Sequence, residues 1–366
     1  MADMPDIYED KKLIGSLTDR IASALRHPLT IMEVCGTHTM SIAASGLRSL
    51  LPPGLRLISG PGCPVCVTDS SLISAALALA RLPQVTLTTF GDMLRVPAGE
   101  QSLQTLREQG ADVRLVLSPL DAMEIAAREQ ERQVVFFAVG FETTAPLTAS
   151  TLELARELRL DNFSVLSAHK TMPAALRSLL GGDARVDGLL CPGHVAAVTG
   201  ADNFDFVSRE MGLPAAVAGF SPVEILLAVA ALVEMSEAGE ARLVNCYKRA
   251  VKPEGNPAAR EILERVFLPC DARWRGLGDL PGSGLAIRPE FAAFDAAARF
   301  ATEIAAAPVF RDDPACRCGD VLRGELQPAR CPLFGEACTP QHPCGACMVS
   351  SEGSCAAAYR YGEGSV

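Results

Sequence analysis

Several features typical of secreted, membrane and nucleic-acid-binding proteins are missing from this sequence. The first residues, MADMPDIYEDKK, are acidic and lack the apolar stretch of a signal peptide. The longest charge-free apolar run of the helix predicted near its middle is Ile225 to Val233, far shorter than a membrane span. The formal charge is −10, with one Trp and four Tyr, so a basic face or base-stacking platform is not expected. We therefore predict a cytoplasmic protein that binds neither membranes nor nucleic acid.

Several catalytic signatures are also absent. There is no P-loop, GxGxxG or GxSxG motif, which argues against an NTPase, a dinucleotide-dependent enzyme or a hydrolase of those families. The CxxxCxxC pattern of radical enzymes that use S-adenosylmethionine is missing too. No second CxxC is spaced as in a zinc ribbon.

What is present is an ordinary globular composition with many cysteines. Hydrophobic residues make up 49% and charged residues 21% of the chain, which excludes disorder. The 366 residues suggest two or three domains, at roughly 100–200 residues each. Thirteen cysteines are an odd number for a chain without an export signal, and seven of them lie between Cys316 and Cys355. Such crowding points to metal or redox chemistry.

Short apolar runs alternate with segments of helical period through the first 240 residues. This alternation predicts parallel β-sheet covered by helices, an α/β fold. Helices are expected near residues 9–26 and 222–240, the latter capped by Ser221 and Glu224, and at Ser70–Arg81, Thr148–Leu158 and Pro173–Leu180. The predicted strands are Leu29–Val34, Leu55–Ser59, Val85–Phe90, Val113–Ser118, Val134–Val139, Phe163–Ser167 and Gly188–Cys191.

These strands allow either one large sheet or two small ones divided near residue 120. We favour two, because the unusual motifs fall into two groups. The expected domains are two small parallel-sheet α/β domains, residues 1–120 and 121–240, facing across a cleft. A loop-rich C-terminal domain, residues 241–366, would follow. Gly276–Gly284 reads as a connection, and the irregular stretch 310–350 needs stabilisation that bound metal can supply.

Polar motifs directly follow five of the predicted strands. In open parallel sheets, ligands bind at the carboxyl ends of the strands, so these motifs predict one shared site or two facing sites. The motifs are CGTHT from Cys35, GPGCPVC from Gly60, GFETT from Gly140, AHK from Ala168 and PGH from Pro192.

Two of these motifs carry thiols. Cys35 and His38 could reach one metal ion if the segment turns, or be a buried thiol and a hydrogen-bonded imidazole. Cys63 and Cys66 could form a redox-active dithiol, half a metal site or an inert pair. Because Cys66 lies just before the helix that follows, we expect the helix dipole to lower the pKa of its thiol.

The remaining motifs offer a carboxylate, hydroxyls and an imidazole. Glu142, Thr143 and Thr144 could serve chemistry or simply cap a helix before Pro146. His194 sits in a turn that exposes its ring, although a structural role is the alternative. Among the seven C-terminal cysteines, four thiolates could hold a 4Fe–4S cluster or a zinc ion. Their spread-out spacing favours the cluster.

Taken together, these motifs resemble the HypD family of hydrogenase maturation proteins. The similar stretches occur in order along essentially the whole chain, which makes the resemblance specific. They are EVCGTHTM (33–40), SGPGCPVCV (59–67), GFETTAPLTA (140–149), CPGHV (191–195), VAGFSPVEIL (217–226) and the region from CRCGDVLRG to GACMVSSEGSCAAAYRYG.

The resemblance implies a scaffold that assembles the Fe(CN)2CO unit of NiFe hydrogenases together with HypC, with HypE as the cyanide donor. It implies iron held at Cys35, with His194 as a further ligand or neighbour, and a redox-active pair Cys63/Cys66. The family's cluster spacing, C-x12-C-x6-C-x16-C, matches four cysteines here and implies a 4Fe–4S cluster. These are Cys318, Cys331, Cys338 and Cys355.

On this reading the protein is a redox-active assembly scaffold rather than a conventional turnover enzyme. It would be a monomer that forms hetero-complexes. Electrons would pass from the cluster through Cys63/Cys66 to iron carrying CN and CO at Cys35. Glu142 and His194 would handle protons or orient ligands, while nearby groups would bind the diatomic ligands, namely Thr37, His38, Thr39, Thr143 and Thr144.

Three cysteines, Cys316, Cys344 and Cys347, are left over by this assignment, and Cys347 is the reserve ligand. Two other functions remain open. One is a thiol–disulfide oxidoreductase with a structural metal site, and the other is a non-catalytic metal-binding interaction protein.

Overall fold

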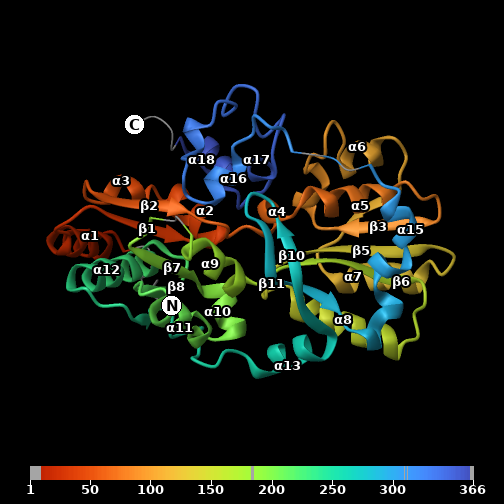
Figure 1. The fold of residues 1–366 in the computed structure, drawn as a ribbon, viewed down its shortest axis with the longest axis horizontal. Coiled ribbons are helices and arrows are strands. Elements are labelled where there is room, and N and C mark those ends of the chain that lie inside the picture. The colour runs from red at the N-terminus through yellow and green to blue at the C-terminus, as the bar shows by residue number, and fades with distance from the viewer. Residues whose placement is uncertain (1–9, 183–184, 309, 311, 363–366) are drawn as a thin grey trace, which may run out of the picture.

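Two parallel β-sheets and one antiparallel hairpin form the framework of the protein (Figure 1). The computed structural model describes residues 10–182, 185–308, 310 and 312–362. All seven predicted strands are present, and both large sheets are parallel, so the predicted α/β class is confirmed. In order across the sheet, the first sheet contains β2 (Leu55–Ser59), β1 (Leu29–Glu33), β7 (Gly188–Pro192), β8 (Ala215–Ala218) and β9 (Leu243–Asn245). The second contains β4 (Val113–Leu115), β3 (Val85–Thr89), β5 (Gln133–Gly140) and β6 (Phe163–His169).

The division of the strands between the sheets differs from the predicted sequential split near residue 120, which is wrong. Strand β1 pairs with β2 on one side and with β7 on the other, so the chain leaves the first sheet after β2 and returns to it at β7. The CGTHT and PGH motifs therefore follow two neighbouring strands of the same sheet. The physical reason is that β7 and β8 are buried on every residue and need central positions, which an existing strand edge at β1 provides.

The helices cover both sheets much as predicted. Helix α12 is confirmed with its capping box. The Ser221 hydroxyl accepts from the backbone N–H of Glu224, and the Glu224 carboxylate accepts from the backbone N–H of Ser221. It packs against α1 beside the first sheet (Figure 1). The observed bounds of the five predicted helices are α1 (Lys11–Ala24), α5 (Ser70–Ala80), α8 (Ala145–Glu157), α9 (Met172–Leu180) and α12 (Pro222–Ala238).

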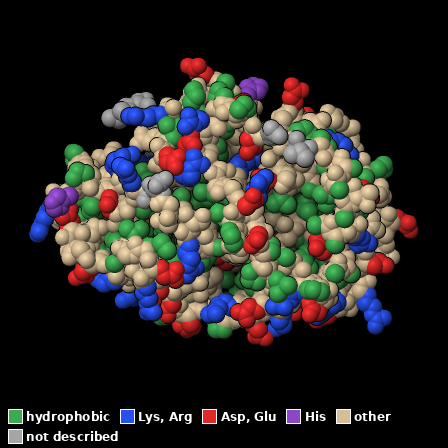
Figure 2. Space-filling view, viewed as in Figure 1, with side chains coloured by type: hydrophobic (Ala, Val, Ile, Leu, Met, Phe, Trp, Pro, Cys, Tyr) green, Lys and Arg blue, Asp and Glu red, His purple; other side chains and the backbone are tan. Residues whose placement is uncertain are grey.

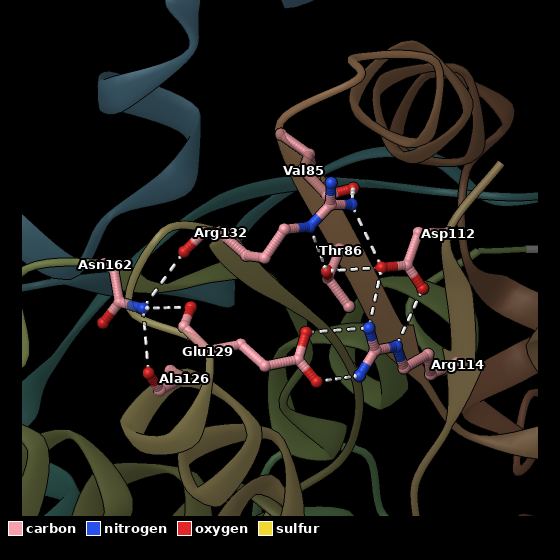
Figure 3. A network of polar contacts seen from close by, with 8 residues as sticks. All are labelled: Val85, Thr86, Asp112, Arg114, Ala126, Glu129, Arg132 and Asn162. Carbon is pink, nitrogen blue, oxygen red and sulfur yellow. Dashed lines mark hydrogen bonds and ion pairs between the residues drawn. The ribbon is translucent and has the colours of Figure 1, made fainter.

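A polar network ties the amino ends of the second sheet together (Figure 3). The Arg114 guanidinium donates to the carboxylates of Asp112 and Glu129, and Arg132 donates to Asp112 and to the backbone of β3. The buried Asn162 amide donates to three backbone carbonyls near α7 (Pro119–Arg128) and β5. This edge is thus closed by internal bonds, which leaves the carboxyl edge for function.

An unpredicted hairpin lies between the two sheets in Figure 1. Strands β10 (Phe267–Trp274) and β11 (Gly278–Ile287) pair antiparallel, so Gly276–Gly284 is not a simple connection. The burial of the hairpin alternates along β10, and the six glycines and prolines of the hairpin disguise that period in the sequence. Strands β8 and β9 were missed because they are only four and three residues long.

The C-terminal segment packs on both parts of the molecule, as Figure 1 shows in blue. Helix α18 (Ser354–Tyr361) contacts α2 (Gly36–Ala44), and α17 (Ala346–Val349) contacts α4 (Pro64–Val67). The segment also contains α16 (Cys318–Leu322). The C-terminal cysteines are thereby carried to the same edge as the motifs that follow β1 and β2.

The surface fits the acidic but mixed composition. On the face shown in Figure 2, basic and acidic side chains are interspersed, without a large patch of one sign. Among the residues that the structure describes, none of the helices combines the length and the apolar character that a bilayer crossing requires.

Candidate metal and thiol site

Cys35 lies two residues after the end of β1 and is the N-cap of α2, in a buried position. Its backbone N–H donates to the Glu33 carboxylate at 3.2 Å, and Thr39 donates to the same carboxylate. A Cβ on Gly62 would lie 2.2 Å from the Cys35 nitrogen, so only glycine lets the GPGCPVC loop pass this close. Burial, followed by the nearby carboxylates, raises the pKa of the Cys35 thiol to about 12. A metal cation would reverse this cost by stabilising the thiolate.

Two histidines at this edge of the sheet pack against one aromatic ring, that of Phe220. His38 donates from Nε2 to the Gly219 carbonyl at 2.9 Å, and its Nδ1 is buried without a partner among the described residues. Its ring lies 4.8 Å from that of Phe220, and His194 stacks on the same ring at 3.8 Å. Burial lowers the pKa of both imidazoles, that of His38 to about 4. Phe220 thus holds two neutral imidazoles at the carboxyl edge of the first sheet.

Glu352 completes this group and was not predicted. Its carboxylate accepts from the Thr37 hydroxyl at 2.7 Å, and it acts electrostatically on both Cys35 and His194. A Cβ on Gly36 would lie 2.5 Å from the Glu352 Cβ, so α2 and the C-terminal segment touch here. Its place in SSEGSC, just before Cys355, was the available signal.

Cys63 and Cys66 lie close together as free thiols in and beside the short helix α4. The Cys66 N–H donates to the Cys63 sulfur at 3.2 Å, and Cys63 donates to the Ser350 hydroxyl. The expected lowering of the Cys66 pKa is wrong. Burial, together with contacts to Cys347 and Cys63, raises the pKa of the Cys66 thiol. Cys66 lies inside α4 and not at the N-terminus of α5, whose cap is Asp69, so the cost of desolvation dominates.

Cys347 is the central thiol of the site, although the sequence marked it only as a reserve. It lies within hydrogen-bonding reach of Cys318, Cys355 and Cys66. These contacts lower the pKa of Cys347, while the contacts with Cys347 together with burial raise the pKa of Cys318, Cys355 and Cys66. A Cβ on Gly353 would lie 2.1 Å from the Cys347 carbonyl oxygen, so a glycine is needed for this packing. Cys347 therefore connects the Cys63/Cys66 pair to the C-terminal cysteines.

A small cavity in the C-terminal segment is walled by cysteines. All four predicted ligands line it, together with Cys316 and Cys347, and with apolar groups including Phe334 and Met348. Cys316 acts electrostatically on Cys338 and Cys331, whereas Cys318 has Cys347 as its closest influence. Cys344 lies next to Cys338, to whose sulfur its N–H donates.

The donor set of this cavity fits an iron–sulfur cluster. Cysteine thiolates are the usual ligands of such clusters, and six cysteines line the walls of this cavity. Among the described residues, no group of three or more His, Cys, Asp or Glu side chains is placed to hold a single metal ion.

The GFETT motif lies at the carboxyl edge of the second sheet. Glu142 accepts from the Met172 N–H at 2.9 Å, and its Oε2 is buried without a partner among the described residues. Burial raises the pKa of Glu142 to about 7. The Thr144 hydroxyl donates to the Phe141 carbonyl, and Thr143 is exposed. Neither hydroxyl has a contact with Cys35 among the described residues. Helix α8 begins after Thr144, and Glu142 is not its cap.

The protein is therefore an α/β protein with a thiol-rich site. Histidines and carboxylates lie at the edges of its two parallel sheets, and the C-terminal segment holds a cysteine-lined cavity. A family model described as "Hydrogenase formation hypA family" and named HypD matches residues 11–362. The chain belongs to the HypD family.

Curated relatives agree over almost the full length. The chain is 44% identical to the hydrogenase maturation factor HypD of Rhizobium leguminosarum bv. viciae over 370 residues, which covers 97% of this chain and 95% of the relative. It is 44% identical to the Escherichia coli (strain K12) HypD over 355 residues, covering 96% and 94%. It is also 44% identical to the hydrogenase expression/formation protein HupD of Azotobacter chroococcum mcd 1 over 367 residues, covering 98% and 96%.

Proposed function

We propose that this chain is a hydrogenase maturation factor that acts as a scaffold for the Fe(CN)2CO unit of NiFe hydrogenases. Its curated relatives carry the maturation function in their names, and the similarity spans nearly the whole chain. One observation carries the scaffold proposal furthest. Cys347 contacts both Cys66 and the thiols of the cysteine cavity, which gives a continuous buried thiol path toward the edge that holds Cys35.

In this proposal the iron unit is the cargo and Cys35 holds it. Burial keeps the Cys35 thiol protonated, so Cys35 would lose its proton when it binds iron. The buried position would then shield the bound iron from solvent. The imidazole of His194 is partly open to solvent, whereas His38 is fully buried and bonded to Gly219. His194 is therefore the better candidate for a further iron ligand.

Around the cargo, the chain supplies hydrogen bonds and a charge. Thr37 is held by Glu352, which fixes the first turn of α2 relative to the C-terminal segment. Glu33 fixes the backbone of Cys35 and the hydroxyl of Thr39. The hydroxyls of Thr37 and Thr39 each donate their one hydrogen to a carboxylate, so either would have to give up that bond to serve a ligand of the iron.

The resident group of the cysteine cavity is proposed to be a 4Fe–4S cluster. When bound, it would supply one-electron transfer at low potential. Cys331, Cys338 and Cys355 are three of its proposed ligands. The predicted fourth is Cys318, but Cys316 faces Cys331 and Cys338 while Cys318 faces Cys347, so Cys316 is the alternative.

The thiols of Cys63, Cys66 and Cys347 then act as the redox link. A dithiol becomes a disulfide by giving up two electrons and two protons, and the reverse step takes up both. Ser350 accepts from Cys63 and donates to Asp92, so a proton leaving Cys63 has a hydrogen-bonded exit. Glu142, with its raised pKa, is a second proton holder at the neighbouring sheet.

A scaffold of this kind needs partners. We propose a HypC-type protein that contributes a second thiolate to the iron and a HypE-type cyanide donor. The mixed surface of Figure 2 has no extended basic or acidic face in that view, so shape and local contacts would dominate their docking.

The experiment is anaerobic purification with the HypC partner co-expressed, followed by iron and sulfide analysis and infrared spectroscopy. About four irons and four sulfides per chain beyond the cargo, with cyanide and CO bands, are expected. Cys35→Ala should remove the infrared bands and keep the sulfide. Persistence of the bands in Cys35→Ala would falsify the scaffold role.

Matched serine variants then identify the fourth cluster ligand. Loss of sulfide in Cys318→Ser but not in Cys316→Ser supports the predicted set, and the reverse result supports Cys316. Zinc without sulfide in the wild-type protein would overturn the cluster and favour a thiol–disulfide oxidoreductase with a structural metal.

A further inference from the structure

The turn of the β10–β11 hairpin is seated between the two thiol-bearing parts of the site. The Arg275 N–H donates to the Val67 carbonyl of α4 at 2.9 Å. On the other side, Gly276 has a φ of +80°, and a Cβ there would lie 2.5 Å from the Cα of Gly319, the residue after Cys318. The turn therefore places Arg275 between the Cys63/Cys66 helix and the start of α16.

The Arg275 side chain is buried and poorly compensated. It is 4% exposed, and its Nε and Nη2 have no hydrogen-bond partner among the described residues. It forms an ion pair with Asp312, whose Oδ1 lies 3.2 Å from Nη2 and whose side chain is 46% exposed. Arginine keeps its charge, and a buried charge with open N–H groups is costly. A structure that retains such a group needs another negative partner for it.

The cysteine site lies next to this turn, because Gly276 packs on Gly319, the residue after Cys318. Arg275 acts electrostatically on Cys318, which lines the cysteine cavity. The thiol groups of this cavity become negative when they bind metal, and the whole site becomes more negative when it accepts electrons.

We propose that Arg275 is a charge-compensating residue of the cysteine site, whose fixed positive charge raises the reduction potential of the cluster in that cavity. The inference rests on the proposed function, because it assumes that cluster. When the site takes one electron from a reductant, its net charge becomes one unit more negative. A cation buried nearby stabilises that state more than the oxidised state, because little solvent screens it.

The test is a redox titration of the full-length, cluster-loaded protein with dithionite as reductant, followed by electron paramagnetic resonance. Arg275→Gln should lower the midpoint potential, and Arg275→Lys should stay close to wild type. Asp312→Asn, which removes the opposing carboxylate, should raise it. A matched control is Arg273→Gln, two residues earlier on β10, where the side chain is 60% exposed and pairs with Asp279. This control should leave the potential unchanged.

The sign of the shift separates charge from structure. If Arg275 only supported packing, its loss would admit water, which stabilises the reduced cluster and raises the potential. An unchanged or raised potential in Arg275→Gln overturns the inference. If that variant does not fold, Asp312→Asn decides, and an unchanged potential there overturns it. Absence of iron and sulfide from the wild-type protein would instead sink the proposed function.

Discussion

At the scale of single residues, burial rather than residue type sets the chemistry of this site. Glu142 and Glu33 are carboxylates at strand ends, and burial raises the pKa of each to about 7. Cys35 and Cys66 are thiols whose pKa burial raises instead of lowering. Reactivity at neutral pH therefore depends on a metal or a neighbouring thiol that compensates desolvation.

Glu142 gives a pH-dependent prediction. Burial raises its pKa from 4.5 to about 7. Because the folded pKa is the higher one, this carboxyl favours folding fully below pH 4.5, and the contribution is lost as pH rises through about 7. Relative to wild type, the free energy of unfolding of Glu142→Gln should increase with pH, by up to about 3 kcal/mol in total.

Denaturant unfolding at several pH values measures this difference. Glu124→Gln, on a side chain that is 59% exposed, is the matched control and should differ from wild type by a constant amount. Parallel pH profiles for Glu142→Gln and wild type would contradict the burial argument.

At the scale of elements, short connections bring the thiols together. The hairpin turn contacts α4 through Arg275 and α16 through Gly276, while α17 carries Cys347 to Cys66. None of these elements is a long amphipathic helix or a fully buried strand. Their positions depend on close backbone contacts that only glycine allows.

Two glycines of the same turn make a matched pair. Gly276 and Gly278 have φ values of +80° and +81°, so alanine is strained at both. A Cβ meets Gly319 only at position 276, and at 278 it meets nothing within 4 Å. Gly276→Ala should therefore cost about 1–3 kcal/mol more than Gly278→Ala. Denaturant unfolding measures both, and equal losses would show that the turn does not press on α16.

At the scale of the whole molecule, the C-terminal segment joins the two sheet regions. Ser351 and Ser350 bond to Asp92 after β3, while Glu352 bonds to Thr37 of α2. The chain itself crosses twice between the sheets, since β1 and β2 share a sheet with β7. The site is therefore assembled from parts that are distant in the sequence.

Hydrogen exchange tests how far this segment depends on its metal. Residues 312–355 contain little regular structure, so a bound cluster would supply much of their order. Removing the cluster with a chelator and an oxidant should speed amide exchange there and in α4, while β1 and β5 should exchange as before. A uniform change across the chain, or none in this segment, would contradict that view.

Strong local patterns in the sequence determined much of the fold. The seven buried strands and the capped helix α12 follow from apolar runs and a capping box, so they could be predicted. The motifs at the strand ends likewise identified Cys35, His194 and Glu142 as candidates, because parallel sheets gather such ends at one edge.

Only the tertiary structure decided which parts meet. Sheet membership depends on which strand edge a later strand finds, and no local pattern encodes that β7 pairs with β1. The same holds for Glu352 beside Thr37, Cys347 beside Cys66 and Arg275 beside Cys318. Each pair is distant in the sequence and is joined by long-range packing, and burial then sets its charge state. The sequence thus identifies candidate residues of the site, whereas the fold determines which residues they contact and how their pKa values shift.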